Sequence, residues 1–216
     1  MDVVTTTKKE KWIEKSRKVP YLVAYIKPST SLARRAFSIE RELRAVDSRH
    51  TFLPEACLHI TLKEFGFLGD DVEPGNLPRV LDAVKRVASK QGPFSVSVGG
   101  VGIFPSTIYG RVENGAEEIR GMNGKLVDEL DGMVIRTPYD RENFKPHISL
   151  LHFGVKDIAP LLKKAESLAS KTVGDMIVRN VHVAKWYPYR LFGTKREREK
   201  VREPLAVCKL GHGKRQ

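Results

Sequence analysis

The stretch LHITL at residues 58–62 recurs as PHISL at residues 146–150, which lies 88 residues further along the chain. Each stretch holds a histidine, a hydroxyl residue two positions later, and an aliphatic residue after each of them. In a β-strand alternate side chains point to opposite faces. The imidazole and the hydroxyl therefore share one face, while the aliphatic residues point into a core. The pattern predicts two strands, each presenting an imidazole beside a hydroxyl.

Two such strands facing one another would form a pocket with His59 and Thr61 on one side and His147 and Ser149 on the other. Imidazole has an unperturbed pKa of about 6.5, so at neutral pH one ring can accept a proton while the other gives one up. In-line phosphoryl transfer needs these two groups on opposite sides of the phosphorus. The hydroxyls can donate hydrogen bonds to the non-bridging oxygens. The four residues therefore predict phosphoryl transfer that needs no metal.

The composition is that of a globular protein, with 41% hydrophobic and 30% charged residues in a chain of 216. No apolar run is long enough to cross a bilayer, so we expect no membrane association. The polar, lysine-rich start is not a secretory signal. Cys57 and Cys208 are the only cysteines, which favours a reducing compartment. We expect a cytoplasmic monomer.

The charge is strongly basic, with a formal net charge of +12. From Lys185 onward there are ten Lys and Arg residues against three Glu. A basic patch at one end favours a polyanionic partner such as RNA, and the basic loop at 190–202 is placed to follow an RNA backbone. A generally basic, solvated surface is the alternative interpretation.

The order of predicted elements is typical of an α+β protein with a largely antiparallel sheet. We expect strands at 19–26, 58–66, 94–98, 107–112, 146–153, 176–186 and 205–210, and helices at 32–46, 78–90, 116–130 and 158–170. The chain divides into a basic N-terminal extension at 1–18, a single domain at 19–210 and a basic tail at 211–216. Residues 8–18 could form a short helix carrying Trp12 and Ile13 on one side; disorder of this segment is an equal alternative.

A metal centre is the first chemical alternative, because Cys57, His59, His147 and His152 all carry ligating atoms. However, the odd separation of His147 and His152 places them on opposite faces of a strand. His152 is then expected on the face of Ile148, in a structural role. The sequence contains no CxxC or HxxxH motif, so we predict neither a metal nor a cofactor. A Ser-His-Asp hydrolase is disfavoured because there is no GxSxG motif.

The residues around the two stretches resemble the 2H phosphoesterases, in particular the LigT-like RNA 2′,3′-cyclic phosphodiesterases, also called 2′–5′ RNA ligases. Residues 52–63 (FLPEACLHITLK) are similar to the first motif of that family and its lead-in. Phe104-Pro105 is similar to its middle motif, and residues 144–150 (FKPHISL) to its second. The resemblance covers about 19–210 and leaves the N-terminal extension outside.

The resemblance implies a bilobal α+β fold, with two antiparallel sheets facing across a central cleft and helices outside. It implies that His59 and His147 are catalytic and that Thr61 and Ser149 bind phosphate, although Ser149 replaces the commoner threonine. The implied activity is hydrolysis of a terminal 2′,3′-cyclic phosphate, on RNA or a small cyclic nucleotide, to a 2′-phosphate. The alternatives are a 2′–5′ RNA ligase that joins RNA halves, such as tRNA halves, and a non-catalytic RNA-end-binding protein.

Further residues are weaker candidates for the site. Arg141, just ahead of the second motif, and Lys63, which alternation places on the face of His59 and Thr61, are candidate phosphate contacts. An exposed loop arginine is an equally good interpretation of Arg141. Aromatic residues can stack on a base, although core packing also explains most of them. The candidates are Tyr109, Trp186, Tyr187 and Tyr189.

Overall fold

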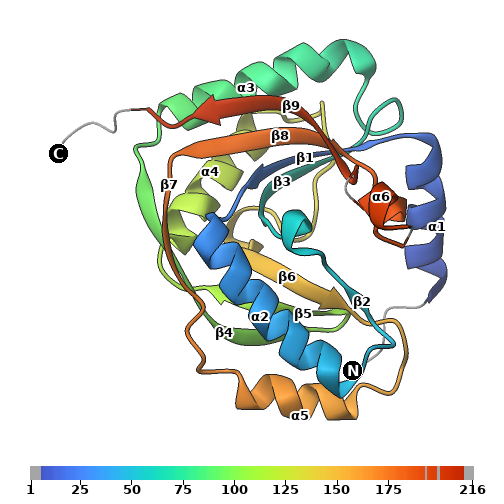
Figure 1. The fold of residues 1–216 in the computed structure, drawn as a ribbon. Helices are drawn as coiled ribbons and strands as arrows, with labels where there is room; N and C mark the ends of the chain where they lie inside the picture. Colours follow the sequence, from blue (N-terminus) through green and yellow to red (C-terminus); the bar gives the residue numbers. More distant parts are fainter. Residues whose placement is uncertain (1–5, 193, 199, 212–216) are drawn as a thin grey trace.

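A single nine-stranded sheet organises the computed structural model, which describes residues 6–192, 194–198 and 200–211. The strand order is β7-β4-β5-β6-β3-β1-β8-β9, with the short β2 paired to β6, and the sheet is curled (Figure 1). Neighbouring strands of this sheet run antiparallel. The strands are β1 (Tyr21–Ile26), β2 (Thr51–Phe52), β3 (Ile60–Phe67), β4 (Phe94–Phe104), β5 (Thr107–Val112), β6 (His147–His152), β7 (Gly174–Val178), β8 (Asn180–Trp186) and β9 (Arg202–Lys209).

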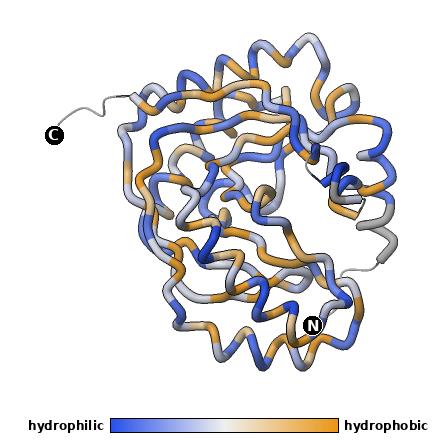
Figure 2. The backbone as a smooth tube through the Cα atoms, in the orientation of Figure 1, coloured by the Kyte–Doolittle hydropathy of each residue, from blue (hydrophilic) through white to orange (hydrophobic). Residues whose placement is uncertain are grey.

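Four helices pack on the sheet and share one large apolar core with it: α2 (Thr30–Val46), α3 (Leu77–Ser89), α4 (Ala116–Glu129) and α5 (Ala159–Ser167). Figure 2 shows hydrophilic and hydrophobic residues alternating along these helices, as amphipathic helices require. Ser29 caps α2 by accepting a hydrogen bond from the Leu32 N–H. The shorter elements are α1 (Thr6–Lys18), α6 (Lys195–Arg198), η1 (Glu55–Cys57), η2 (Pro74–Asn76), η3 (Arg141–Asn143) and η4 (Pro188–Phe192).

Strand β1 shows that the sheet has apolar side chains on both faces. Leu22, Ala24 and Ile26 belong to the large core under the helices. Tyr21 and Tyr25 point the other way, into a smaller apolar cluster. We call the face that carries this second cluster the histidine face, because His59 lies against Tyr25 on it.

The predicted helix in the N-terminal extension forms and covers part of the histidine face. Trp12 of α1 meets Tyr21, Phe67 and Trp186 edge-on, with ring centroids 5.7, 6.4 and 5.8 Å away. Edge-to-face aromatic pairs at these distances stabilise packing beyond the area they bury. Residues 6–18 of the extension are therefore a folded part of the molecule.

Each of the two histidine strands contains an extra residue directly after its hydroxyl residue. In β3, Thr61 lies opposite Tyr25 and Lys63 lies opposite Ala24, which leaves Leu62 unmatched. Such a β-bulge reverses the alternation of side chains beyond it. Lys63 and Glu64 therefore lie on the faces opposite to those that simple alternation predicts. A second extra residue, Phe65, restores the alternation, so that Phe67 lies on the histidine face.

Strand β6 has the corresponding irregularity. Ser149 lies opposite Tyr109, and Leu151 lies opposite Ile108, which leaves Leu150 as the extra residue. Leu150 and Leu151 are both buried in the large core. The side chains after Leu151 consequently exchange faces, as they do in β3.

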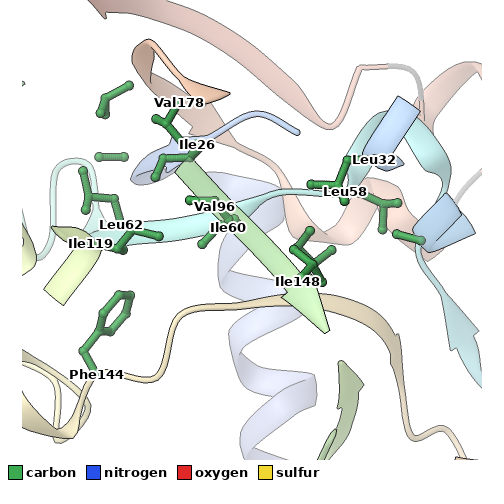
Figure 3. Close-up of a cluster of buried hydrophobic side chains, with 14 of the residues drawn as sticks. Ile26, Leu32, Leu58, Ile60, Leu62, Val96, Ile119, Phe144, Ile148 and Val178 are labelled. Carbon is green, nitrogen blue, oxygen red and sulfur yellow. The ribbon is translucent and has the colours of Figure 1, made fainter. Parts of the chain in front are cut away.

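The α+β class and the antiparallel sheet are confirmed. The two predicted sheets are two halves of one sheet, joined where β3 meets β6 at Ile60 and Ile148 (Figure 3). The predicted strand at 176–186 is interrupted at Arg179, and the strand beginning at Phe94 continues past its glycines to Phe104. No helix in the described residues is long and apolar enough to span a membrane.

Candidate active site

The two sequence motifs meet at a single pair of buried residues. Ile60 of β3 lies opposite Ile148 of β6 in antiparallel register. Partners in an antiparallel pair run in opposite directions, so counting outward from this pair sets His59 beside Ser149 and Thr61 beside His147. The isoleucines point into the core, and the neighbours on either side of each point to the histidine face. The structure thus brings together the four predicted residues in a crossed arrangement.

Both histidine rings are held by the same kind of hydrogen bond. His59 Nδ1 lies 2.9 Å from the Cys57 carbonyl oxygen, and His147 Nδ1 lies 2.8 Å from the Lys145 carbonyl oxygen. In each case the carbonyl belongs to the residue two positions earlier. A carbonyl can only accept, so Nδ1–H is the donor and Nε2 is the nitrogen that can exchange a proton with a ligand.

Aromatic side chains hold the rings edge-on. His59 meets Tyr25 and Trp186 at centroid distances of 5.7 and 5.6 Å. The ring of His147 meets Phe104 at 5.1 Å and Tyr109 at 5.2 Å. Each imidazole is therefore fixed in orientation and partly shielded from water.

Arg202 of β9 distinguishes the first histidine from the second. Its Nη2 lies 2.6 Å from His59 Nδ1 and donates to the Cys57 carbonyl oxygen, so that Arg202 and His59 share this oxygen as acceptor. Burial, and next to it the Arg202 charge, hold the pKa of His59 well below its ordinary value. The pKa of His147 is lowered mainly by burial. Both rings are therefore neutral in the unliganded protein at neutral pH.

Tyr109 is brought to the site, whereas Tyr187 and Tyr189 are held elsewhere. Tyr109 stacks on Phe104 at 4.0 Å, in space left by Gly102, where a Cβ atom would approach the tyrosine ring to 2.5 Å. The Tyr187 hydroxyl donates to Glu203, and Arg190 lies over the rings of both Tyr187 and Tyr189. Tyr187 and Tyr189 are thus engaged in their own cluster at η4.

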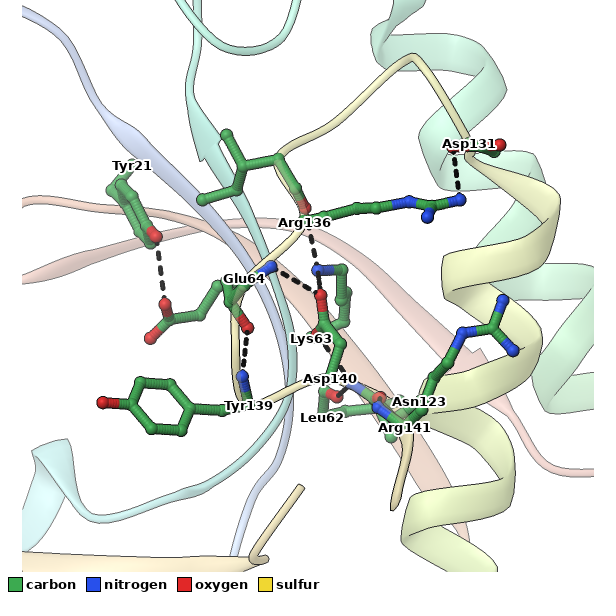
Figure 4. A network of polar contacts seen from close by, with 12 residues as sticks. Tyr21, Leu62, Lys63, Glu64, Asn123, Asp131, Arg136, Tyr139, Asp140 and Arg141 are labelled. Atoms are coloured by element: carbon green, nitrogen blue, oxygen red, sulfur yellow. Dashed lines mark hydrogen bonds and ion pairs between the residues drawn. The ribbon is translucent and has the colours of Figure 1, made fainter. Parts of the chain in front are cut away.

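The prediction that Lys63 shares a face with Thr61 is wrong. The bulge at Leu62 turns Lys63 to the core side, where the residue is 1% exposed. Its Nζ donates to Asp140 Oδ2 at 2.7 Å and to the Ile135 carbonyl oxygen at 2.9 Å (Figure 4). Lys63 therefore supports the segment that leads to the second motif and does not contact a phosphate on the histidine face.

Arg141 also has a role outside the four-residue site. Its backbone takes a left-handed conformation, with φ at 61°, and its N–H donates to Asn123 Oδ1 at 2.7 Å. The guanidinium forms an ion pair with Asp128 of α4. The structure therefore does not bring this candidate phosphate contact to the histidines.

Sequence reasoning missed two residues of the histidine face. His152 was expected beside Ile148, but the bulge at Leu150 places it opposite Thr107, on the same face as Ser149. Arg202 was recognised only as one charge in a basic run. His152 was missed because strict alternation of side chains places it in the core. Nothing in the local sequence indicates that Arg202 approaches His59.

The fold and the paired motifs define the class of protein. The model of the 2′-5′ RNA ligase superfamily matches residues 16–188, and the chain belongs to this superfamily. The resemblance to the LigT-like 2H phosphoesterases is thereby confirmed.

Individual relatives carry more specific names. An RNA 2′,3′-cyclic phosphodiesterase of Methanothermobacter thermautotrophicus is 28% identical over 68% of this chain and 79% of that protein. An RNA 2′,3′-cyclic phosphodiesterase of Geobacillus stearothermophilus is 32% identical over 57% of this chain and 39% of that protein.

Solved structures share the fold at low sequence identity. The TT0787 protein of Thermus thermophilus has a TM-score of 0.66 and 19% identity, over 90% of this chain and 99% of that one. LigT of E. coli complexed with NADP+ has a TM-score of 0.62 and 14% identity, over 89% and 98%. These likenesses support the assigned fold.

Proposed function

We propose that this protein hydrolyses the terminal 2′,3′-cyclic phosphate of RNA to a 2′-phosphate. The observation that carries the proposal is the crossed arrangement of two histidines and two hydroxyl residues about the Ile60–Ile148 pair. Each histidine is fixed through Nδ1 by a backbone carbonyl, which leaves Nε2 for proton transfer. The names of the two relatives support the same substrate class.

The proposed reaction uses one histidine as base and the other as acid. Nε2 of one ring takes a proton from water, whose oxygen forms a bond to phosphorus while the bond from phosphorus to O3′ breaks. The other ring, as imidazolium, gives its proton to O3′. The hydroxyls of Thr61 and Ser149 donate to the non-bridging oxygens, where charge develops.

Binding of the substrate raises the proton affinity of the histidine that must act as the acid. Both rings are neutral without a ligand, because burial opposes their positive charge. An anionic phosphate close to an imidazole favours the charged form of that ring. Binding of the cyclic phosphate would thus allow one histidine to take up a proton and become the acid.

Ligation is the second candidate function, and the name of the superfamily favours it. In that reaction a 5′-hydroxyl replaces water and each histidine keeps its role. The P–O3′ bond breaks, and two RNA ends, such as tRNA halves, are joined by a 2′–5′ bond. Non-catalytic binding of RNA ends is the third candidate. The complete set of histidines and hydroxyls argues against it.

RNA is the proposed partner, because the net charge of +12 favours a polyanion. A small cyclic nucleotide would satisfy the same site. We also propose a monomer that works in the cytoplasm, where the buried free thiols of Cys57 and Cys208 stay reduced.

The test is incubation of EDTA-treated protein with an oligonucleotide ending in a 2′,3′-cyclic phosphate, followed by identification of the product. We expect a 2′-phosphate and a bell-shaped dependence of rate on pH. A His59→Ala, His147→Ala double variant should lose the activity. Equal rates for this variant and the wild type would refute the proposal, and joined RNA ends in a reaction supplied with a 5′-hydroxyl strand would indicate ligation.

A further inference from the structure

The chain between β8 and β9 leaves the sheet beside His59 and returns to it beside the same histidine. Trp186, the last residue of β8, meets the His59 ring edge-on at 5.6 Å. Arg202, the first residue of β9, has its Nη2 at 2.6 Å from His59 Nδ1. Trp186 and Arg202 are partners across the two strands. We call residues 187–201 the β8–β9 connection; it begins and ends at the candidate active site.

Two contacts hold the connection against the rest of the molecule. The Cys57 thiol donates to the Arg198 carbonyl oxygen at 3.9 Å, which places α6 next to η1, just ahead of His59. The Tyr189 N–H donates to Ser16 Oγ of α1 at 3.1 Å. Both α1 and α6 contact η4 (Figure 1). The described residues of the connection therefore form one edge of the site, on the side of His59.

The connection surrounds a surface cavity of about 280 Å³ in which positive charge predominates. Its lining residues are Tyr189, Arg190, Thr194, Arg196, Glu197 and Lys200. Three of these are cations and one is a carboxylate. A cavity of this size lies near the lower end of ligand-binding pockets, and it can take a phosphate group with part of its ribose.

The carboxylate in this cavity is engaged within the connection. Glu197 accepts from the Thr194 N–H at 2.7 Å and from the Thr194 hydroxyl at 2.9 Å. These hydrogen bonds hold the pKa of Glu197 below its ordinary value. Among the residues that the structure describes, neither Arg196 nor Lys200 forms an ion pair with a carboxylate. Both cations are therefore available to an anionic ligand.

Arg190 is held in place before any ligand binds. Its Nε donates to the Tyr189 hydroxyl at 3.0 Å, and its Nη1 donates to the Lys200 carbonyl oxygen. The guanidinium also lies 4.2 Å from the centroid of the Tyr187 ring. A planar guanidinium fixed in this way loses little freedom when it binds a phosphate oxygen. Arg190 is thus a preorganised wall of the cavity.

Further positive charge lies between the cavity and His59. Arg198 and Arg202 are both partly buried, and the Nε–H of each is shielded from solvent without an acceptor among the described residues. Within the same part of the chain, neither guanidinium has a carboxylate partner. Cations that no carboxylate neutralises attract anions to the surface above them. The cavity and the site are therefore joined by a continuous stretch of positive charge.

We propose that this cavity binds a backbone phosphate of single-stranded RNA, upstream of the strand end that lies between His59 and His147. Arg190, Arg196 and Lys200 are its contacts. The inference rests on the proposed function, because that function places the terminal phosphate at the histidines. The lining contains none of the four residues of the two motifs, so a ligand needs a second phosphate to occupy both places. An RNA strand is therefore a better substrate than a mononucleotide.

The test compares a strand with a mononucleotide. A labelled RNA of about six nucleotides ending in a 2′-phosphate is titrated by fluorescence anisotropy over a series of salt concentrations. Adenosine 2′-phosphate is titrated by calorimetry. We expect an Arg196→Gln, Lys200→Gln double variant to bind the strand about fivefold more weakly at low salt. The slope of log affinity against log salt should become shallower by about 0.7 for each lost contact. Affinity for adenosine 2′-phosphate should be unchanged.

An Lys163→Gln, Arg179→Gln double variant is the matched control. It removes the same charge from two exposed residues that form no ion pair within the described chain. Lys163 lies on α5, and Arg179 lies just before β8, at the opposite end of that strand from Trp186. We expect this variant to keep the wild-type salt slope. Poly-glutamate of equal charge should displace the labelled strand less effectively than unlabelled RNA does.

Three results would overturn the inference. They are an unchanged salt slope in the Arg196→Gln, Lys200→Gln variant, an equal change in the control, and equal displacement by poly-glutamate. Hydrolysis of adenosine 2′,3′-cyclic phosphate by the wild type is measured in parallel. Turnover together with an unchanged salt slope removes the inference alone. Strand binding that depends on Arg196 and Lys200, without turnover of any cyclic phosphate, removes the proposed hydrolysis and retains the inference.

Discussion

Nη2 of Arg202 lies 2.6 Å from Nδ1 of His59, and both groups are directed at the carbonyl oxygen of Cys57. The guanidinium disfavours a second positive charge on the adjacent ring. His147 is held by a carbonyl in the same way, yet its pKa is lowered mainly by burial. The two histidines of the repeated motif are therefore chemically unequal.

Replacing Arg202 with Gln should raise the pKa of His59 and leave that of His147 nearly unchanged. The reason is that the variant removes a positive charge from one ring only. An NMR titration of the two ring Cε1–H resonances measures both values. Arg202→Lys, which keeps the charge, is the control, and an unmoved His59 titration in Arg202→Gln would contradict the assignment.

The stability of the protein should fall as the pH decreases below about 6.5, the pKa of an unfolded histidine. The folded-state pKa values of His59 and His147 are depressed, so the unfolded chain binds more protons below that pH. Each ring then contributes a slope of about 1.4 kcal/mol per pH unit. Urea unfolding between pH 5 and 8 should show a shallower slope for His59→Gln, and equal slopes would disprove the buried neutral state.

Lys63→Met should destabilise the protein by about 3 kcal/mol, because it leaves the largely buried Asp140 carboxylate without its cation. The same carboxylate accepts from the Thr137 N–H at 2.8 Å, so the loss also loosens this segment. Affinity for adenosine 2′-phosphate should not change in the folded variant. Calorimetry measures the affinity and urea unfolding measures the stability. Lys156→Met, at an exposed lysine, is the control. If Lys63→Met weakened phosphate binding and Lys156→Met did not, Lys63 would be part of the phosphate site.

Trp12→Ala should lower the free energy of unfolding by about 2–3 kcal/mol, since it removes a half-buried ring from three aromatic contacts. It should also alter the His59 ring resonance, because Trp186 contacts both Trp12 and His59. Trp12→Phe should preserve most of both properties. If the His59 resonance in Trp12→Ala matched the wild type, α1 would support the fold without influencing the site.

The hydroxyls of the two motifs should be partly interchangeable. Thr61→Val and Ser149→Ala remove a hydrogen-bond donor to the developing phosphate charge, and each should reduce kcat by about 10²-fold. Thr61→Ser and Ser149→Thr keep the donor and should retain most of the activity. Steady-state kinetics on a cyclic-phosphate oligonucleotide measure this, and a Thr61→Val variant with wild-type kcat would exclude the hydroxyl from the transition state.

The pairing of His59 with Thr61, and of His147 with Ser149, could be predicted because it depends only on the alternation of a short strand. The core role of Ile60 and Ile148 follows from the same rule. Alternation fails after one extra residue, and no local feature of the sequence marks where that residue is inserted. The same physical cause, one extra residue in the strand, therefore explains why alternation assigns both Lys63 and His152 to the wrong face.

The approach of Arg202 to His59 was beyond prediction for a different reason. It depends on the pairing of β9 with β8 and of β8 with β1, which brings together residues 143 positions apart. Composition identifies the basic segment but does not indicate that Arg202 is the residue of this segment whose side chain points toward the site. Tertiary pairing decides this.

The bulge in β6 also makes the site sensitive to small genetic changes that leave every catalytic residue intact. Deletion of a single codon within Leu150–Leu151 would restore regular alternation, turn His152 toward the core and push Phe153 outward. The reading frame and both motifs would survive. A homologous chain with this deletion would keep both histidine motifs but would no longer have His152 on the histidine face. A comparison limited to the catalytic residues would not detect this difference.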